Sequence, residues 1–311
     1  MAAKVKIGAQ LWPQTDAWPA LRDAVIRADT NGFDSLWTWD HLMAIVGPWD
    51  GPNLEGWTTL AAWASVTKHA TLGLMVGANT FRNPGLTAKL AATLDHISEG
   101  RAILGIGGAW FEREHDAFGI EFGPTPGWRL DRLEESVTLI ERLLAGERIE
   151  HHEGTAYRMH DALAVPRPVQ ARLPICIGGS GPNKTLRTVA KHADIWNTDG
   201  SAEDAARKDA TLRERCAEIG RDPDGIERTA TIEVIIRDDP READRVLRTA
   251  RAGQGDPDVD WTVYVGPPQR VADELRAHVE AGFAHFTVDI LPPYDPETLD
   301  RLPEVRALLG G

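Results

Sequence analysis

The sequence contains little cysteine and an excess of acidic over basic side chains. Two cysteines occur in 311 residues, Cys176 and Cys216, and their spacing is not that of metal ligands. Each lies within an apolar pattern, so we expect both to be reduced packing residues. Lysine and arginine number 34 against 47 aspartates and glutamates, which gives a net charge of −13. Such an acidic chain is a poor candidate for binding nucleic acid or an anionic membrane.

Long apolar runs, targeting signals and metal motifs are also missing. No apolar run is long enough to cross a bilayer and no signal-peptide pattern is found, so we expect a soluble, cytoplasmic protein. Glu112 and His115 have i,i+3 spacing, but neither an HExxH motif nor matched inward-facing partners accompany them. We therefore expect a solvated, charged helix there and no metal site.

Tryptophan, in contrast, is abundant and unevenly placed. The chain has eleven tryptophans, and the first half holds Trp12, Trp18, Trp37, Trp39, Trp49, Trp57, Trp63, Trp110 and Trp128. The simpler interpretation is that these rings fill a core. Several, however, follow the ends of expected strands, where aromatic side chains would form a wide pocket for a planar ligand.

The stretch from Thr71 to Phe111 sets the pattern for the chain. An apolar run from Leu72 to Ala78 precedes a segment from Pro84 to Gly100 whose apolar residues have helical spacing. A second apolar run, Ala102 to Ile106, follows. The pattern predicts a strand, a crossover helix and a parallel strand, and ligands bind at the C-terminal ends of such strands.

The same unit recurs along the chain. The other expected strands are Val5 to Leu11, Phe33 to Trp39, Leu173 to Ile177, Ala193 to Asn197, Thr229 to Ile236 and Ala284 to Ile290. Eight strands alternating with helices predict an α/β fold, a (β/α)8 TIM barrel formed by a single domain over residues 1–311. Residues 146–173 break the alternation, and we expect them to form an insertion with short strands between strands 4 and 5.

One glycine-rich loop is suited to binding an anion. Gly178, Gly179, Ser180 and Gly181 join an apolar strand to a helix that we expect to begin at Pro182. Backbone N–H groups in such a loop converge on an oxyanion, and the helix N-terminus adds partial positive charge. Nearby lie the basic residues Lys184, Arg187 and Lys191. We interpret the loop as a phosphate site, with a tight turn beside a solvated helix face as the alternative.

Two further positions are candidates for chemistry. Asp40 and His41 end the second expected strand, and adjacent residues on an extended chain point to opposite sides. His41 has the right kind of side chain for proton transfer, although a structural role is an even alternative. Gly105 to Gly108 form only half of a dinucleotide fingerprint, so we read these glycines as allowing close approach of a flat ring.

Several segments together resemble a known family. They are FDSLWTWDHL (33–42), LGLMVGANTFRNPGLTAKLAATLDHISEGRAILGIGGAWFEREHDAFG (72–119) and PICIGGSGPNKTLRTVAKHADIWN (174–197), with a looser match in GPPQRVADELRAHVEAGFAHFTVDI (266–290). In this order they resemble the luciferase-like monooxygenase superfamily, in its branch of deazaflavin F420-dependent oxidoreductases. The resemblance implies a TIM barrel, usually a homodimer, with the cofactor across the C-terminal mouth.

The resemblance also implies roles for individual residues. A bulge in the third strand, often with a non-prolyl cis peptide, would back the central ring and maps onto Met75 and Val76, with the ring lying between Val76 and the fourth strand. The remaining cofactor contacts would come from Asn79, Gly107, Gly108, Gly178, Gly179, Ser180, Gly181 and Trp196. The catalytic pair of several F420 enzymes maps onto Asp40 and His41, with Asp40 orienting the histidine or contacting the cofactor.

The implied activity is hydride transfer between coenzyme F420 and a small organic substrate. An FMN-dependent monooxygenase on the same scaffold is the first alternative, since FMN also carries a phosphate, and a non-catalytic F420-binding protein is the second. A barrel isomerase or aldolase lacks support, because no lysine falls at a strand's C-terminal end. A sugar-phosphate dehydrogenase of this branch has an acidic residue where this chain has Trp110, so we expect a substrate less polar than a sugar phosphate.

Overall fold

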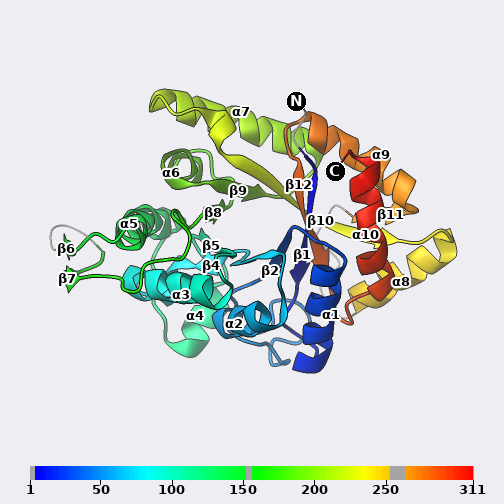
Figure 1. Cartoon of the computed structure of the whole chain (residues 1–311), viewed down its shortest axis with the longest axis horizontal. Helices are drawn as coiled ribbons and strands as arrows, with labels where there is room; N and C mark the ends of the chain where they lie inside the picture. Colours follow the sequence, from blue (N-terminus) through cyan, green and yellow to red (C-terminus); the bar gives the residue numbers. More distant parts are fainter. Residues whose placement is uncertain (1–3, 152–155, 253–262, 311) are drawn as a thin grey trace.

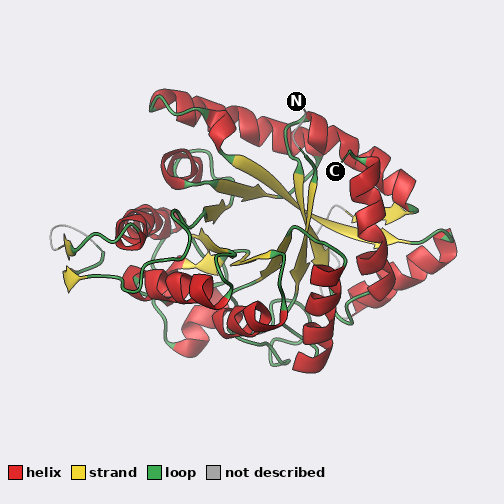
Figure 2. Cartoon of the chain, viewed as in Figure 1, coloured by secondary structure: helices red, strands yellow, loops and turns green. Residues whose placement is uncertain are grey.

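Eight parallel strands form a closed barrel, as the alternation of strands and helices predicts (Figures 1 and 2). The computed structural model describes residues 4–151, 156–252 and 263–310. The barrel strands are β1 (Lys6–Leu11), β2 (Ser35–Thr38), β3 (Thr71–Leu74), β5 (Ala102–Gly107), β8 (Ile175–Gly178), β9 (Ile195–Thr198), β10 (Glu227–Ile236) and β12 (His285–Ile290). Parallel pairing of β12 with β1 and of β10 with β9 closes the ring.

Helices surround this barrel (Figure 2). They are α1 (Trp18–Thr30), α2 (Gly56–Val66), α3 (Pro84–Ile97), α4 (Glu112–Phe118), α5 (Pro126–Leu144), α6 (Thr185–His192), α7 (Ala202–Glu218), α8 (Pro240–Ala252), α9 (Pro268–Glu280) and α10 (Pro296–Leu308). Helix α5 shows why they begin where they do, because the hydroxyl of Thr125 accepts from the Trp128 amide and Pro126 opens the first turn. No helix of the described residues combines the length and hydropathy needed to cross a membrane.

Three details of the chain path differ from the sequence prediction. The apolar run from Leu72 to Ala78 is not one strand: it is interrupted after Leu74, where the family resemblance implies a bulge, and resumes as the short β4 (Gly77–Ala78). A short strand that the pattern does not reveal, β11 (Val263–Gly266), pairs with the end of β10 outside the ring. Helix α6 begins at Thr185 rather than at Pro182, because residues 182–184 form a turn first.

The expected insertion between the fourth and fifth barrel strands holds a small antiparallel hairpin. Its strands are β6 (Ile149–His151) and β7 (Met159–Ala162), which pair between Ile149 and Ala162. Residues 152–155, in the middle of the insertion, lie outside the described residues. In Figure 1 the hairpin projects from the barrel beside α5.

A polar cluster closes the N-terminal end of the barrel. The Oγ of Ser35 lies 2.8 Å from Nε2 of His285, and Nδ1 of His285 lies 2.6 Å from Glu227. Lys6 donates to the same carboxylate at 2.8 Å, and the Trp37 indole donates to Ser35 at 2.7 Å. These are first or third residues of neighbouring strands, so the ladder register brings the side chains together inside the barrel.

Apolar side chains fill the middle of the barrel above this cluster. The group consists of Trp37, Met75, Ile103, Cys176 and Ile195. Both cysteines are buried and unpaired, as predicted, and burial raises the pKa of the Cys176 thiol. The barrel is therefore a solid core below its C-terminal mouth.

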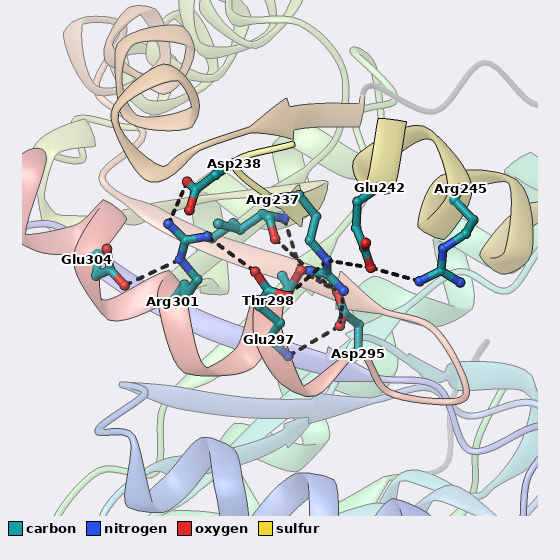
Figure 3. A network of polar contacts seen from close by, with 10 residues as sticks. Arg237, Asp238, Glu242, Arg245, Asp295, Glu297, Thr298, Arg301 and Glu304 are labelled. Atoms are coloured by element: carbon teal, nitrogen blue, oxygen red, sulfur yellow. Dashed lines mark hydrogen bonds and ion pairs between the residues drawn. The ribbon is translucent and has the colours of Figure 1, made fainter. Parts of the chain in front are cut away.

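The start of α10 is fixed to the end of β10 by a network of ion pairs (Figure 3). Both terminal nitrogens of Arg237 donate to the carboxylate of Asp295, at 3.0 and 2.8 Å, and Glu297 contacts the same arginine. Arg301 pairs with Asp238 at 2.9 Å. This network holds the loop that leaves β12 at the mouth of the barrel.

Candidate functional site

A cavity of about 870 Å³ opens at the C-terminal ends of the barrel strands. Its size is within the range of about 300–1,000 Å³ typical of small-molecule and cofactor sites. The predicted site residues that line it are Asp40, His41, Met75, Val76, Gly107, Gly108, Gly178, Gly179 and Ser180. The structure therefore brings together residues that lie far apart in the sequence, at the position where barrels bind ligands.

Three predicted site residues do not line this cavity. Trp196 is fully buried, packs against Phe283 and donates from its indole to the carbonyl of Gly179 at 2.8 Å. Asn79 is also buried, and its amide donates to the Tyr157 hydroxyl at 3.1 Å. Gly181 lies next to the lining residue Ser180 but is not itself part of the wall. Trp196 thus supports the glycine loop from behind.

A glycine-rich wall, formed by Gly107, Gly108 and Gly178, makes up one side of the cavity, and Gly107 and Gly178 lie against Val76. A Cβ on Gly107 would lie 2.7 Å from a Val76 methyl, and one on Gly178 would lie 2.9 Å from it, so neither position accepts a side chain. The Met75–Val76 peptide bond is cis, as the family resemblance implies. The expected space between Val76 and the fourth strand is absent, because Val76 contacts Gly107 directly, so a ring would lie on the cavity side of both.

The glycine loop offers free backbone donors. The N–H of Gly179 donates to the carbonyl of Asn197 at 3.1 Å. The N–H groups of Ser180 and Gly181 donate to no acceptor among the described residues. Because Ser180 lines the cavity, this loop retains the feature that a phosphate site requires.

The basic residues expected beside this loop are engaged elsewhere. Lys184 pairs with Asp131, Lys191 with Glu134, and Arg187 lies 3.7 Å from Glu218. Acidic side chains on α5 and α7 thus neutralise the predicted basic cluster. The prediction from sequence spacing was incomplete, because it could not include the helices that pack against α6.

The cation of the cavity is instead Arg129, on the first turns of α5. Of the described residues that line the cavity, it is the one lysine or arginine. Its side chain is buried, its guanidinium lies 3.7 Å from the centre of the Phe122 ring, and its Nε has no partner. Burial lowers the pKa of this guanidinium, although the charge of Glu112 opposes the effect. The arginine is placed to meet an anionic ligand.

His41 lies at the cavity and is held by a carboxylate that the sequence does not pair with it. Its Nδ1 lies 2.9 Å from the buried carboxylate of Glu114, whose other oxygen accepts from the Leu42 amide at 2.8 Å. The imidazole stands edge-on to Trp39 and Trp110, with ring centres 5.6 and 5.5 Å apart. These contacts fix the ring and leave Nε2 for proton transfer.

Asp40 has a different role from the one of orienting His41. Its carboxylate accepts two hydrogen bonds from Arg82, at 2.6 and 2.9 Å, and a third from the Ala78 amide at 2.9 Å. Arg82 also pairs with Glu55 at 2.8 Å. Burial raises the pKa of Asp40, against the opposing effect of Arg82. Asp40 thus anchors the bulged third strand, and Glu114 is the residue that orients the histidine.

The residues of α4 that were considered as metal ligands are not arranged around a common metal position. His115 is buried and bonded to the Thr80 hydroxyl and the Phe111 carbonyl, at 2.6 and 2.8 Å. Among the described residues no group of three or more histidine, cysteine, aspartate or glutamate side chains is arranged to hold a metal ion. Helix α4 is therefore a structural element that brings Glu114 to His41.

The closed parallel barrel and the cavity at its mouth define a protein that binds its ligand at the C-terminal ends of the strands. The model of the luciferase-like monooxygenase family matches residues 1–285, and the chain belongs to this family. The F420-dependent glucose-6-phosphate dehydrogenase of Kineococcus radiotolerans is 34% identical over 312 residues, which cover 91% of this chain and 90% of that protein.

Two further comparisons extend this finding. The phthiodiolone/phenolphthiodiolone dimycocerosates ketoreductase of Mycobacterium bovis is 31% identical over 266 residues, covering 77% of this chain and 68% of the relative. A solved F420-dependent secondary alcohol dehydrogenase, in complex with an F420–acetone adduct, matches with a TM-score of 0.86 over 99% of both chains. Its identity is 20%, so this match shows likeness of fold.

Proposed function

We propose that this protein is an F420-dependent oxidoreductase that transfers a hydride between coenzyme F420 and a small organic substrate. The observation that carries the proposal is the cavity itself, which has a glycine-rich wall beside the Met75–Val76 bulge and is also lined by His41. Relatives over most of the chain include an F420-dependent dehydrogenase. Bound F420 would supply the hydride acceptor or donor at carbon 5 of its ring.

The cofactor would be held by backbone groups more than by side chains. Met75, Val76, Gly107 and Gly108 would pack against the ring. In the loop from Gly178 to Gly181, the free N–H groups of Ser180 and Gly181 would face its phosphate. Arg129 would add the positive charge that the neutralised lysines do not supply. Trp196 and Asn79 would not contact the cofactor. They would support the site through their hydrogen bonds to the Gly179 carbonyl and the Tyr157 hydroxyl.

His41 would accept or donate the proton that accompanies hydride transfer. In alcohol oxidation the imidazole would accept the O–H proton, while bound F420 would supply the acceptor for the hydride of the C–H bond. In carbonyl reduction the imidazole would return the proton to the oxygen. Glu114 would hold Nδ1 and stabilise the charged imidazole. Asp40 would position the third strand against the cofactor through Arg82 and the Ala78 amide.

Cofactor titration tests the proposal directly. The purified protein is titrated with F420 and with FMN, and binding is followed by fluorescence. We expect micromolar or tighter binding of F420 and weaker binding of FMN. Micromolar binding of FMN alone would favour the alternative function, an FMN-dependent monooxygenase. The description of the family, luciferase-like monooxygenase, is compatible with this alternative.

Two further experiments address the remaining alternatives. A protein that binds F420 without catalysis would show no substrate-dependent oxidation or reduction of the cofactor across a broad set of alcohols and carbonyl compounds. We also expect a homodimer, as the family resemblance implies, and light scattering after size exclusion would measure the mass. A mass of 34.1 kDa would contradict the expected dimer, because it is that of a single chain.

A further inference from the structure

A polar wall faces the glycine-rich wall across the cavity. Strand β12 lies four strands from β5 in either direction around the ring, so the two are opposite each other. Asp289 on β12 is in register with Gln10 on β1 and with Glu233 on β10. All three line the cavity and are almost fully buried. We call these three residues the polar wall.

Hydrogen-bonding groups remain unsatisfied at this wall. One oxygen of Asp289 accepts from the Trp12 indole at 2.9 Å, but Oδ2 has no partner. Oε1 of Gln10 also lacks one, and so does the indole N–H of Trp39, which lines the cavity next to His41. Buried polar groups without partners are rare in folded proteins and indicate a ligand or a functional role. Here the Trp39 indole is a donor and the Gln10 oxygen an acceptor, and the role of the Asp289 oxygen depends on whether it carries a proton.

The wall is rigid. Trp12 donates to Asp289 and its own carbonyl accepts from the Tyr294 hydroxyl at 2.6 Å. Tyr294 belongs to the loop after β12, whose far end Arg237 holds through Asp295 (Figure 3). The carboxyl group of Asp289 is therefore held by Trp12, which Tyr294 fixes in turn, as a preorganised recognition group should be.

The charge at the wall excludes some ligands. Burial raises the pKa of Asp289, the Trp12 hydrogen bond opposes this rise and the charge of Glu233 adds to it, so that the pKa is about 8. At neutral pH the carboxyl group of Asp289 therefore holds its proton and can donate from Oδ2. Arg129, the cation among the described lining residues, belongs to α5 and has Glu112 as its charged neighbour, not Asp289.

We propose that Asp289, Gln10 and the Trp39 indole bind a hydroxyl group of the substrate, which is a neutral alcohol or ketone carrying a second oxygen function. A hydroxyl group both donates and accepts, so it satisfies this mixed set. An ammonium group would leave the indole unmatched, and a phosphate group would leave the glutamine oxygen unmatched. The inference rests on the proposed function, since it assigns the substrate class of the same cavity.

Matched substrates that differ by one hydroxyl test the inference. Reduced F420 is offered with 2-butanone or acetoin, and oxidised F420 with 2-butanol or 2,3-butanediol, and kcat/KM is measured for each. We expect the hydroxylated member of a pair to be preferred by about tenfold or more, because an analogue lacking the hydroxyl leaves buried polar groups unpaired. Equal kcat/KM within each pair, or turnover of none of the four, overturns the hydroxyl site.

Variants of the polar wall test whether its residues cause the preference for the hydroxylated substrate. Asp289→Asn keeps a donor in place of Oδ2 and should retain the preference, whereas Asp289→Leu should abolish it. If Asp289→Leu does not fold, Gln10→Met should still reduce the preference. Gln14→Met is the matched control, because Gln14 is buried, does not line the cavity and bonds only to backbone groups of Val46 and Ile45. The preference of this variant should equal the parent's. A preference that survives Asp289→Leu and Gln10→Met contradicts the assignment.

The two proposals fail in different ways. Absence of F420 binding in the titration removes the oxidoreductase function and the substrate site with it. F420 binding and turnover without a hydroxyl preference leave the function in place and remove only the substrate site. Glucose 6-phosphate is included in the substrate set, and turnover of it above that of acetoin also overturns the neutral-substrate class.

Discussion

Two histidine–carboxylate pairs lie at opposite ends of the same barrel, and they differ in whether a ligand can reach them. His41 pairs with Glu114 at the C-terminal mouth, and its ring lines the cavity. His285 pairs with Glu227 at the N-terminal end, and its second nitrogen bonds to the buried hydroxyl of Ser35. The second arrangement has the connectivity of a serine hydrolase triad, but the serine is fully enclosed.

The two pairs therefore differ mainly in whether a ligand can reach them, and less in the chemistry of their side chains. A Cβ on Gly8 would lie 2.2 Å from the Ser35 hydroxyl, and the Trp37 indole donates to that oxygen, so no substrate reaches it. His41 has aromatic rings at its edges but an open ligand cavity beside it. We infer that the upper pair serves catalysis and the lower pair serves stability, and four predictions test this contrast.

The largest expected effect is on turnover when the upper histidine is removed. His41→Ala should lower kcat by about 10²–10⁴-fold, the typical contribution of a general acid or base. F420 affinity should stay close to the parent's, because the cofactor wall is built from other residues. Steady-state kinetics with acetoin and a fluorescence titration measure the two quantities. Parent-like turnover would remove His41 from the mechanism.

Removing the carboxylate behind His41 should have a smaller effect on the same step. In Glu114→Gln one of the two carboxylate oxygens becomes an NH2 group, which cannot accept from His41 or from the Leu42 amide, so the ring loses part of its orientation. We expect kcat to fall less than in His41→Ala, with a shifted pH profile. Asp116→Asn, an exposed change on the same helix, is the control, and an equal loss there would contradict the positioning role.

The lower histidine should affect stability and leave turnover intact. His285→Ala removes the partner of Ser35 and one partner of Glu227, which should cost about 1–3 kcal/mol of the free energy of unfolding. Denaturant unfolding measures the loss, and kcat of the folded fraction should match the parent's. Loss of kcat at unchanged stability would reverse the assignment of the two ends.

The smallest expected effect is on how the free energy of unfolding changes with pH in the acidic range. Burial alone would raise the pKa of Glu227, but His285 and Lys6 outweigh it and lower this pKa from 4.5 to about 2. Because the folded-state pKa is lowered, the stabilisation is present above the unfolded value and is lost as pH falls through the folded value. Unfolding between pH 5 and pH 2 should therefore be less pH-dependent in Glu227→Gln. An unchanged slope would show that Glu227 does not contribute.

Sequence patterns predicted the barrel because apolar runs alternate with segments of helical spacing, although β2, β3, β8 and β9 have only four residues each. Strand β11 was not predicted because it lies outside the ring and adds no unit to the alternation of strands and helices. The start of α6 was placed three residues early, since Pro182 opens a turn rather than the helix. The Met75–Val76 bulge came from family resemblance, not from periodicity.

The parts of the candidate site that lie within one short segment could be predicted from the sequence. The parts that come together only through the pairing of distant strands could not. The glycine loop and His41 are visible as local motifs. Glu114 is 73 residues from His41 and reaches it only through the short helix α4. Asp289 and Gln10 lie near opposite ends of the chain, and only the pairing of β12 with β1 makes them neighbours.

The most direct measurement is a crystal structure of the protein with F420 bound. The account predicts the ring on the cavity side of Val76 and Gly107, its phosphate at the amides of Ser180 and Gly181, and its reactive carbon facing His41. A ring bound elsewhere, or one whose reactive carbon faces away from His41, would contradict the account.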